Sequence, residues 1–157
     1  MSDNIRSVDV GQPAPDFALK DQNNEVVSLA SFAGEKNVVL IFHPLAFTGI
    51  CEGELCAVQS ELPTFENDDV QVLSISVAPS PSHKVWANQQ GFTFPLLSDF
   101  WPHGAVAQAY GCFDETKGVA TRATYVIDKA GIVRWKTMNA IPDARDHAEY
   151  AKALAEL

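Results

Sequence analysis

The stretch NVVLIFHPLAFTGICEGELC, residues 37–56, places a cysteine at the junction between two expected elements. Its first six residues form a continuous apolar run, which is typical of a strand buried on both faces. The residues after Thr48 read as a helix that runs into the sixties and is disturbed at Pro63. Cys51 is therefore predicted to lie in the first turn of a helix that follows a buried strand.

This position favours the reactive form of a thiol. Thr48 is expected to cap the helix, so the free N–H groups and the dipoles of the first turn stabilise an anion by roughly 0.3–1 kcal/mol. The thiolate is the form of cysteine that attacks electrophiles. The alternative is a buried cysteine that only packs as a small hydrophobic side chain. The polar neighbours Glu52 and Glu54 argue against that alternative.

The rest of the chain predicts an α/β fold with one mixed sheet. Residues 37–77 read as strand, helix and strand, which implies two parallel strands joined by a right-handed crossover. The segments ATYVID and GIVRWKT flank the turn KAG and must pair antiparallel. We expect helices on both faces of the sheet. Further elements are an N-terminal hairpin around QNN, a helix ending at Gly91, a shorter one ending at Gly111, and a C-terminal helix within residues 143–157.

Composition limits the classes of function. The chain has 157 residues and a net charge of −9, so we expect one domain over residues 1–157, with residues 1–10 flexible, and no nucleic-acid partner. No apolar run is long enough to span a membrane, and the first residues do not resemble a signal peptide. Three cysteines in such a chain suggest a reducing compartment, which predicts a cytoplasmic location.

The segment PLAFTGIC, with Pro44, Thr48 and Cys51, matches the peroxiredoxin pattern Pro-x-x-x-Thr-x-x-Cys, and Glu54 extends the match. The segments NVVLIFHPLAFTGICEGEL, GFTFPLLSDFWPHGAVAQAYG and RATYVIDKAGIVRW resemble the AhpE-type subfamily of peroxiredoxins. The resemblance extends from Gly11 to about residue 138. It implies a thioredoxin-like fold with an added N-terminal hairpin, and neither a metal nor an organic cofactor.

The resemblance implies a thiol-dependent peroxidase that reduces hydrogen peroxide and organic hydroperoxides and serves antioxidant defence and cell redox homeostasis. Cys51 is the expected peroxidatic nucleophile, which becomes a sulfenic acid. Thr48 lies one turn before it, with its hydroxyl on the same side as the sulfur. Arg122 opens the segment RATYVID and, by the resemblance, donates to both the thiolate and the peroxide. Glu54 is expected to orient Arg122, and Pro44 to remove a backbone donor and make the loop rigid.

Cys56 departs from the one-cysteine pattern of the AhpE-type proteins. Residues five apart in a helix differ by ~7.5 Å of rise and ~140° of rotation. Their α-carbons are then about 8–9 Å apart, beyond the roughly 7 Å limit for a disulfide. Cys56 can thus resolve the sulfenic acid only if the first turn unwinds after oxidation, at the spacing seen in the bacterioferritin-comigratory (peroxiredoxin Q) branch. The alternative is that Cys56 only packs. Cys112 belongs to no motif and is expected to be inert.

Two other classes of function remain open. A thiol–disulfide oxidoreductase on the same fold is disfavoured because no Cys-x-x-Cys is present. A non-enzymatic module would instead bind a small anion at the helix N-terminus. The reductant of a peroxidase would be thioredoxin, a glutaredoxin-like protein or a low-molecular-weight thiol, and the resemblance implies a homodimer. Phe47, Phe100 and Trp101 are candidates for a pocket mouth or an oligomer contact, and the histidines show no metal-ligand spacing.

Overall fold

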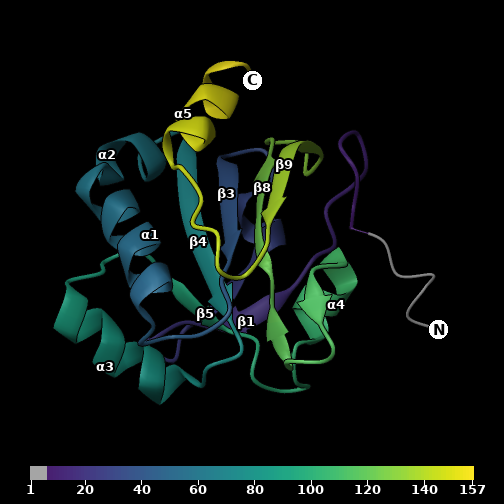
Figure 1. Ribbon diagram of the computed structural model, residues 1–157. Coiled ribbons are helices and arrows are strands. Elements are labelled where there is room, and N and C mark those ends of the chain that lie inside the picture. Colours follow the sequence, from purple (N-terminus) through teal and green to yellow (C-terminus); the bar gives the residue numbers. More distant parts are fainter. Residues whose placement is uncertain (1–6) are drawn as a thin grey trace.

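The computed structural model describes residues 7–157, and it is built around one five-stranded mixed sheet (Figure 1). The strand order is β5-β4-β3-β8-β9. β3 pairs in parallel with β4 and antiparallel with β8, and β9 extends the sheet antiparallel to β8. The bounds of these strands are Asn37–Phe42 for β3, Val70–Ser76 for β4, Leu96–Ser98 for β5, Arg122–Ile127 for β8 and Val133–Asn139 for β9. The predicted mixed sheet is confirmed.

Both faces of the sheet are covered, which explains the uninterrupted apolar run of β3. Val38, Leu40 and Phe42 belong to one buried cluster, whereas Val39 and Ile41 belong to another. Side chains alternate across a strand, so a strand with two buried faces needs apolar residues at every position. This burial places the carboxyl end of β3, where the loop to Cys51 begins, at a fixed point in the molecule.

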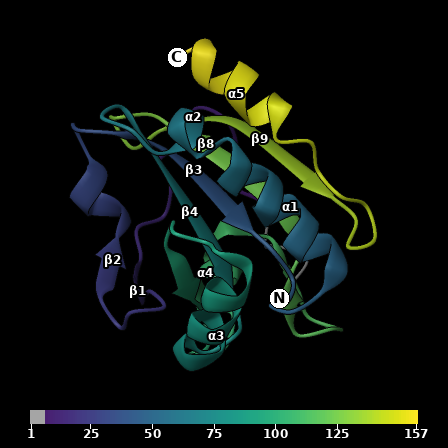
Figure 2. The same ribbon diagram turned by 90° about the vertical axis from the view of Figure 1, so that its left-hand side faces the viewer.

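Four helices cover the face that carries Val39 and Ile41, as Figure 2 shows for α1 and α5. They are α1 (Gly49–Ser60), α2 (Leu62–Phe65), α3 (Ser80–Gln90) and α5 (Ala148–Ala155). The opposite face is covered by α4, the 3-10 helix η2 and the hairpin of β1 and β2. Their bounds are Ala105–Tyr110, Leu29–Phe32, Ala18–Lys20 and Val26–Ser28. The predicted hairpin and the helices on both faces are thus confirmed.

The structure also contains short elements that the sequence did not indicate. The edge strand β5 pairs with β4 through three residues, and β6 (Phe113–Asp114) forms a two-residue ladder with β7 (Val119–Ala120). Such segments are too short to show periodicity. The C-terminal helix starts at Ala148, later than expected, because residues 141–147 before it form turns and irregular structure.

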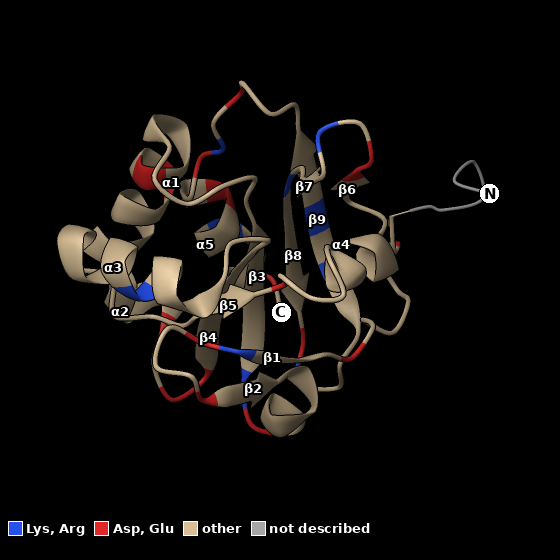
Figure 3. Cartoon of the chain, turned by 90° about the horizontal axis from the view of Figure 1, so that it is seen from below, with Lys and Arg blue, Asp and Glu red and all other residues tan. Residues whose placement is uncertain are grey.

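The N-terminal segment and the distribution of charged residues complete the description of the fold. Residues 1–10 were predicted to be flexible, and of these, residues 1–6 lie outside the described residues. Val8, in the described part, donates its backbone N–H to Tyr110 O at 3.0 Å. Charged residues are scattered over loops and elements, with basic residues on β9 and α3 (Figure 3). Within residues 7–157, no helix has the length and apolar character needed to cross a bilayer.

Candidate active site

Cys51 lies in the first turn of α1, as predicted, but its side chain points inward. Thr48 precedes the helix in an extended conformation, and the Cys51 side chain is fully buried beside Leu55 and Val58. Of its polar neighbours, Glu52 is half-buried and Glu54 is buried. The expectation that polar neighbours keep this cysteine out of the core was therefore wrong, because the helix turns the thiol toward the sheet together with its apolar side.

Arg122 reaches this buried thiol from β8. Its Nη1 donates to Cys51 Sγ at 3.3 Å and to Glu54 Oε1 at 2.7 Å, and its Nε donates to the carbonyl of Ile141. The residue is only 2% exposed, so it is not a solvated charge at a strand edge. The predicted pairing of Glu54 with Arg122 is present, and it fixes the guanidinium against the sulfur.

A second arginine, Arg145, holds the other side of Glu54 and was not predicted. Its Nε and its backbone N donate to Glu54 Oε2 at 2.8 and 2.7 Å, and its Nη2 donates to Oε1 at 2.9 Å. Its Nη1 donates to the carbonyls of Phe42 and Ala123, at the ends of two sheet strands. Arg145 precedes α5 in a polar segment that carries no motif, so only the tertiary structure reveals it.

The carboxyl group of Glu54 is ionised in this setting. Burial alone would raise its pKa, but the hydrogen bonds and charge of Arg145, with the charge of Arg122, hold the pKa of Glu54 below its ordinary value. Burial would likewise lower the pKa of Arg145, and the hydrogen bonds with Glu54 reverse that effect and raise it. The site is therefore a buried carboxylate between two guanidinium groups, one of which also contacts the thiol.

The loop from β3 to α1 carries Pro44 and Thr48. Pro44 is buried, and the Thr48 hydroxyl donates to Leu45 O at 3.1 Å instead of capping the helix. The prediction that the Thr48 side chain caps the helix was wrong, although its backbone oxygen accepts from Glu52 N at 2.8 Å. The loop bends sharply at Phe47, which has a positive φ of 63° that is uncommon for a non-glycine residue.

An apolar pocket opens at this loop and brings together three of the predicted residues, Pro44, Thr48 and Arg122. Cys51 does not line it and lies beneath, within reach of Arg122. The remaining lining residues are Leu45, Gly49, Ile50, Lys117, Ile141 and Pro142. A small molecule in this pocket would therefore meet a hydroxyl and a guanidinium next to the thiol, with aliphatic side chains around them.

The other cysteines lie apart from this arrangement. Cys56 is on the same uninterrupted helix, half-buried, with its Sγ 3.7 Å from Gln90 Oε1. Burial, followed by the charge of Glu52, raises the pKa of the Cys56 thiol. Cys112 is buried on the opposite face of the sheet, and its burial raises its pKa strongly. All three cysteines are free.

The exposed aromatic candidates do not line this pocket. Phe47 is 46% exposed, whereas Phe100 and Trp101, which are 50% and 80% exposed, line a separate pocket beside Pro79 and Ser98. A role of these side chains at an oligomer contact stays a prediction. Within residues 7–157, no group of three or more metal-ligating side chains comes together.

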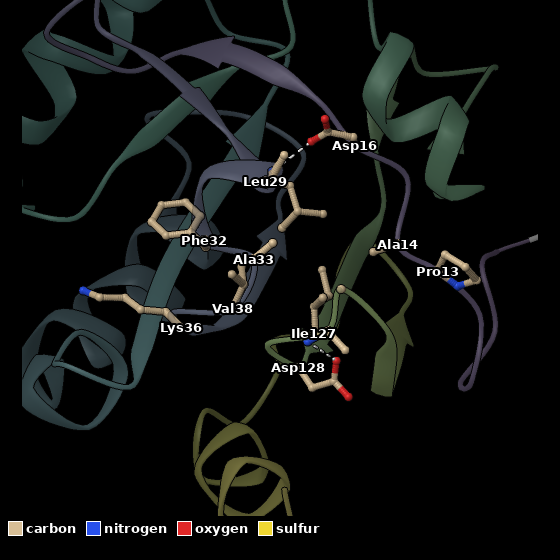
Figure 4. Close-up of a pocket in the computed structure, with 13 residues that line it drawn as sticks. Pro13, Ala14, Asp16, Leu29, Phe32, Ala33, Lys36, Val38, Ile127 and Asp128 are labelled. Atoms are coloured by element: carbon tan, nitrogen blue, oxygen red, sulfur yellow. Dashed lines mark hydrogen bonds between the residues drawn. The ribbon is translucent and has the colours of Figure 1, made fainter.

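Another pocket lies elsewhere on the molecule, between η2, residues 13–16 and the β8–β9 turn (Figure 4). Leu29 and Phe32 line it from one side and Pro13 from the opposite side, with Ile127 and Asp128 between them. Its lining contains no cysteine, histidine or arginine. This pocket therefore contains none of the residues predicted for the active site.

Comparisons with known proteins agree with this arrangement. Residues 10–136 match the model of the AhpC/TSA family. The chain is 57% identical over 150 residues to alkyl hydroperoxide reductase E of Mycobacterium tuberculosis, covering 96% of this chain and 98% of that protein.

Solved structures show the same fold. The crystal structure of Enterococcus faecalis AhpC superposes with a TM-score of 0.85 at 27% identity, covering 94% of this chain and 90% of that one. Peroxidoxin BcpB of M. tuberculosis gives a TM-score of 0.83 at 29% identity, covering 94% and 97%. The thioredoxin-like fold and the resemblance to AhpE-type proteins are thereby confirmed, and the chain belongs to the AhpC/TSA family of peroxiredoxins, which are thiol-dependent peroxidases.

Proposed function

We propose that this peroxiredoxin reduces hydroperoxides with Cys51 as its nucleophile. The Cys51 thiolate attacks the terminal oxygen of a hydroperoxide, the new S–O bond forms, and the O–O bond breaks. The departing oxygen keeps the electron pair, takes a proton and leaves as water or an alcohol. Cys51 is left as a sulfenic acid, oxidised by two electrons, and the peroxide has been reduced by two.

The roles of the neighbouring residues follow from where charge moves. Negative charge passes from the sulfur to the departing oxygen, and Arg122 can donate to both because its Nη1 already lies 3.3 Å from Cys51 Sγ. Thr48 lines the pocket, and its hydroxyl, whose proton is donated to Leu45 O, can accept from the hydroperoxide O–H, or donate to the peroxide once the bond to Leu45 is given up. Glu54 holds Arg122 in place, and Arg145 holds Glu54. Pro44 offers no backbone N–H to compete for the peroxide and restricts the loop.

The pocket supports organic hydroperoxides among the substrates, alongside hydrogen peroxide. Leu45, Ile50 and Ile141 surround the polar corner made by Thr48 and Arg122, so an alkyl group has apolar side chains to cover it. The name of the 57% identical relative, alkyl hydroperoxide reductase E, points to the same substrate class.

The sulfenic acid must then be reduced by a thiol. The reductant is thioredoxin, a glutaredoxin-like protein or a low-molecular-weight thiol, and Cys56 is a conditional resolving cysteine. Both cysteines lie on one continuous helix, so the disulfide forms only after the first turn of α1 opens. In that step the Cys56 thiol attacks the Cys51 sulfenic acid and water leaves. The raised pKa of Cys56 suits a thiol that stays protonated until the turn opens.

Assembly and location complete the proposal. Phe47 and Leu45 expose apolar surface on the active-site loop, and Trp101 does so elsewhere, which supports a homodimer through the loop face. Three free cysteines support a reducing compartment, and hence the cytoplasm.

The observation that carries the proposal is the contact between Arg122 Nη1 and Cys51 Sγ beside a pocket lined by Thr48 and Pro44. Treating the protein with one equivalent of hydroperoxide and a sulfenic-acid trapping reagent, followed by mass spectrometry, tests it. We expect the trap on Cys51 alone. A trap on Cys112, or a Cys51 that carries neither the trap nor a disulfide to Cys56, would overturn the assignment.

A further inference from the structure

A row of three polar contacts joins α1 to α3 and the turn after it, and all three join residues 34 apart in the sequence. Trp86 Nε1 donates to Glu52 Oε1 at 2.9 Å. One turn later Cys56 Sγ lies 3.7 Å from Gln90 Oε1, and further along Gln59 Nε2 donates to Thr93 Oγ1 at 3.0 Å. The constant separation means that the two segments run side by side in fixed register.

Only the first contact of this row reaches the turn that carries the nucleophile. Glu52 is the residue after Cys51, whereas Gln59 lies two turns further along α1. The first turn of a helix has few intrahelical hydrogen bonds, so a tertiary contact there has more influence on local opening than one in the middle of the helix.

Trp86 also holds the loop that leads into the helix. Its ring lies 6.0 Å from the ring of Phe47, measured between centroids, and 5.5 Å from that of His43. Phe47 has the positive φ and is 46% exposed, so its own burial contributes little to its unusual conformation. Trp86 itself is fully buried and is therefore a rigid support. One side chain of α3 thus contacts residues before, within and after the active-site loop.

We infer that Trp86 is a positioning residue for the peroxidase reaction, and that its hydrogen bond to Glu52 clamps the Cys51 turn in the form that meets Arg122. The inference rests on the proposed function, because it concerns the geometry of the Cys51 thiol. The clamp keeps Cys51 within reach of Arg122 Nη1, and its loss lets the first turn of α1 fray away from the pocket.

Two neutral replacements of Glu52 separate the effect of its hydrogen bond to Trp86 from the effect of its negative charge. Glu52→Gln keeps a carbonyl oxygen that accepts from the Trp86 indole, whereas Glu52→Ala removes the acceptor, and both remove the negative charge. A hydrogen bond of ordinary strength corresponds to about a fivefold change in rate. We therefore expect Glu52→Ala to oxidise about fivefold more slowly than Glu52→Gln. The readout is the second-order rate of Cys51 oxidation, followed by rapid quenching with iodoacetamide and mass spectrometry.

The matched control is Gln59→Ala. It removes the contact with Thr93, two turns away in the same row, and should leave the rate of Cys51 oxidation unchanged. A double-mutant cycle measures the coupling between Glu52 and Trp86. Once Trp86→Phe has removed the donor, adding Glu52→Ala should not slow Cys51 oxidation any further. Amide hydrogen exchange of α1 provides the structural readout. Glu52→Ala should speed exchange in the first turn after Cys51 but not near Ser60.

Equal rates for Glu52→Ala and Glu52→Gln, or an equal slowing by Gln59→Ala, would overturn the clamp while leaving Cys51 as the nucleophile. Additive effects of Glu52→Ala and Trp86→Phe would also overturn it. If the wild-type protein is not oxidised at Cys51 at all, the proposed function fails and the clamp fails with it. The two failures are therefore distinguished by the wild-type measurement.

Discussion

Arg122 Nη1 lies 3.3 Å from Cys51 Sγ although 71 residues separate them. The contact exists because β8 is antiparallel to β3, which brings the start of β8 to the end of β3 from which the Cys51 loop departs. The same nitrogen lies 2.7 Å from Glu54 Oε1, one helical turn beyond the cysteine. The fold thus presents a fixed cation to the thiol.

Replacing Arg122 by lysine should slow Cys51 oxidation by ~10²-fold or more, because a single ammonium cannot donate to the sulfur, Glu54 and the peroxide in one plane. Thr48→Val should have an effect of similar size, since it removes the hydroxyl that contacts the peroxide with little change of side-chain shape. Stopped-flow measurement of peroxide consumption gives the rates. Unchanged rates in both variants would remove these residues from the mechanism.

Glu54→Gln should destabilise the fold by about 3–5 kcal/mol, because it leaves the buried charges of Arg122 and Arg145 without their partner. The pKa of Glu54 is lowered in the folded state, so its stabilisation is present at neutral pH and is lost as the pH falls below the ordinary carboxyl range. Urea unfolding measures this.

A surface ion pair provides the control for that variant. Asp69 pairs with Lys129, and its side chain is 75% exposed. Asp69→Asn should therefore change the free energy of unfolding by less than about 1 kcal/mol. If Glu54→Gln costs no more than Asp69→Asn, the buried network does not hold Arg122.

Stability should also fall between neutral pH and pH 5 because of His83. Burial lowers the pKa of His83 from 6.5 to about 4, so in this window the unfolded chain binds more protons than the folded one. Stability then rises with pH. The difference at pH 5 is roughly 2 kcal/mol for His83 alone. The buried His43, whose pKa is lowered chiefly by burial and then by the charges of His83 and Arg145, adds to it.

Urea unfolding of His83→Asn at several pH values tests this dependence. In the variant the free energy of unfolding should rise less steeply with pH than in the wild type, since asparagine has no proton to gain. Its amide can still bond to Ser76. Equal slopes in the wild type and His83→Asn would show that His83 is protonated as easily in the folded state as in the unfolded chain.

The sequence was informative where chemistry depends on neighbours along the chain. The strand that ends at Phe42, the helix that starts beside Thr48 and the position of Cys51 all follow from local pattern. The link between Glu54 and Arg122 was predicted from the family pattern and not from periodicity. Local pattern therefore predicts the nucleophile and the sheet that presents it.

The sequence was silent where the site depends on packing between distant segments. Arg145 comes from a polar stretch without periodicity, and the indole of Trp86 meets Glu52 only because α3 packs beside α1. The inward direction of Cys51 and the Thr48 hydroxyl bond to Leu45 are likewise set by the tertiary fold. None of these contacts has a spacing in the sequence that reveals it.

Cys56→Ser should divert the oxidised protein from disulfide to sulfenic and then sulfinic acid on Cys51 under excess peroxide, because no thiol remains to trap the sulfenic acid. Thiol mapping after one equivalent of hydroperoxide should find a Cys51–Cys56 disulfide in the wild type. If only Cys51 is modified there, and the variant turns over as fast with every reductant, Cys56 has only a packing role.

Cys51→Ser is the most direct test of the proposed mechanism. Serine lacks the thiolate but has nearly the same shape, so the variant should fold as the wild type does by circular dichroism. Peroxide consumption in the presence of excess dithiothreitol should fall to the background rate of the reductant alone. If the folded variant instead retains more than a few per cent of the wild-type activity, Cys51 is not the nucleophile and another group reduces the peroxide.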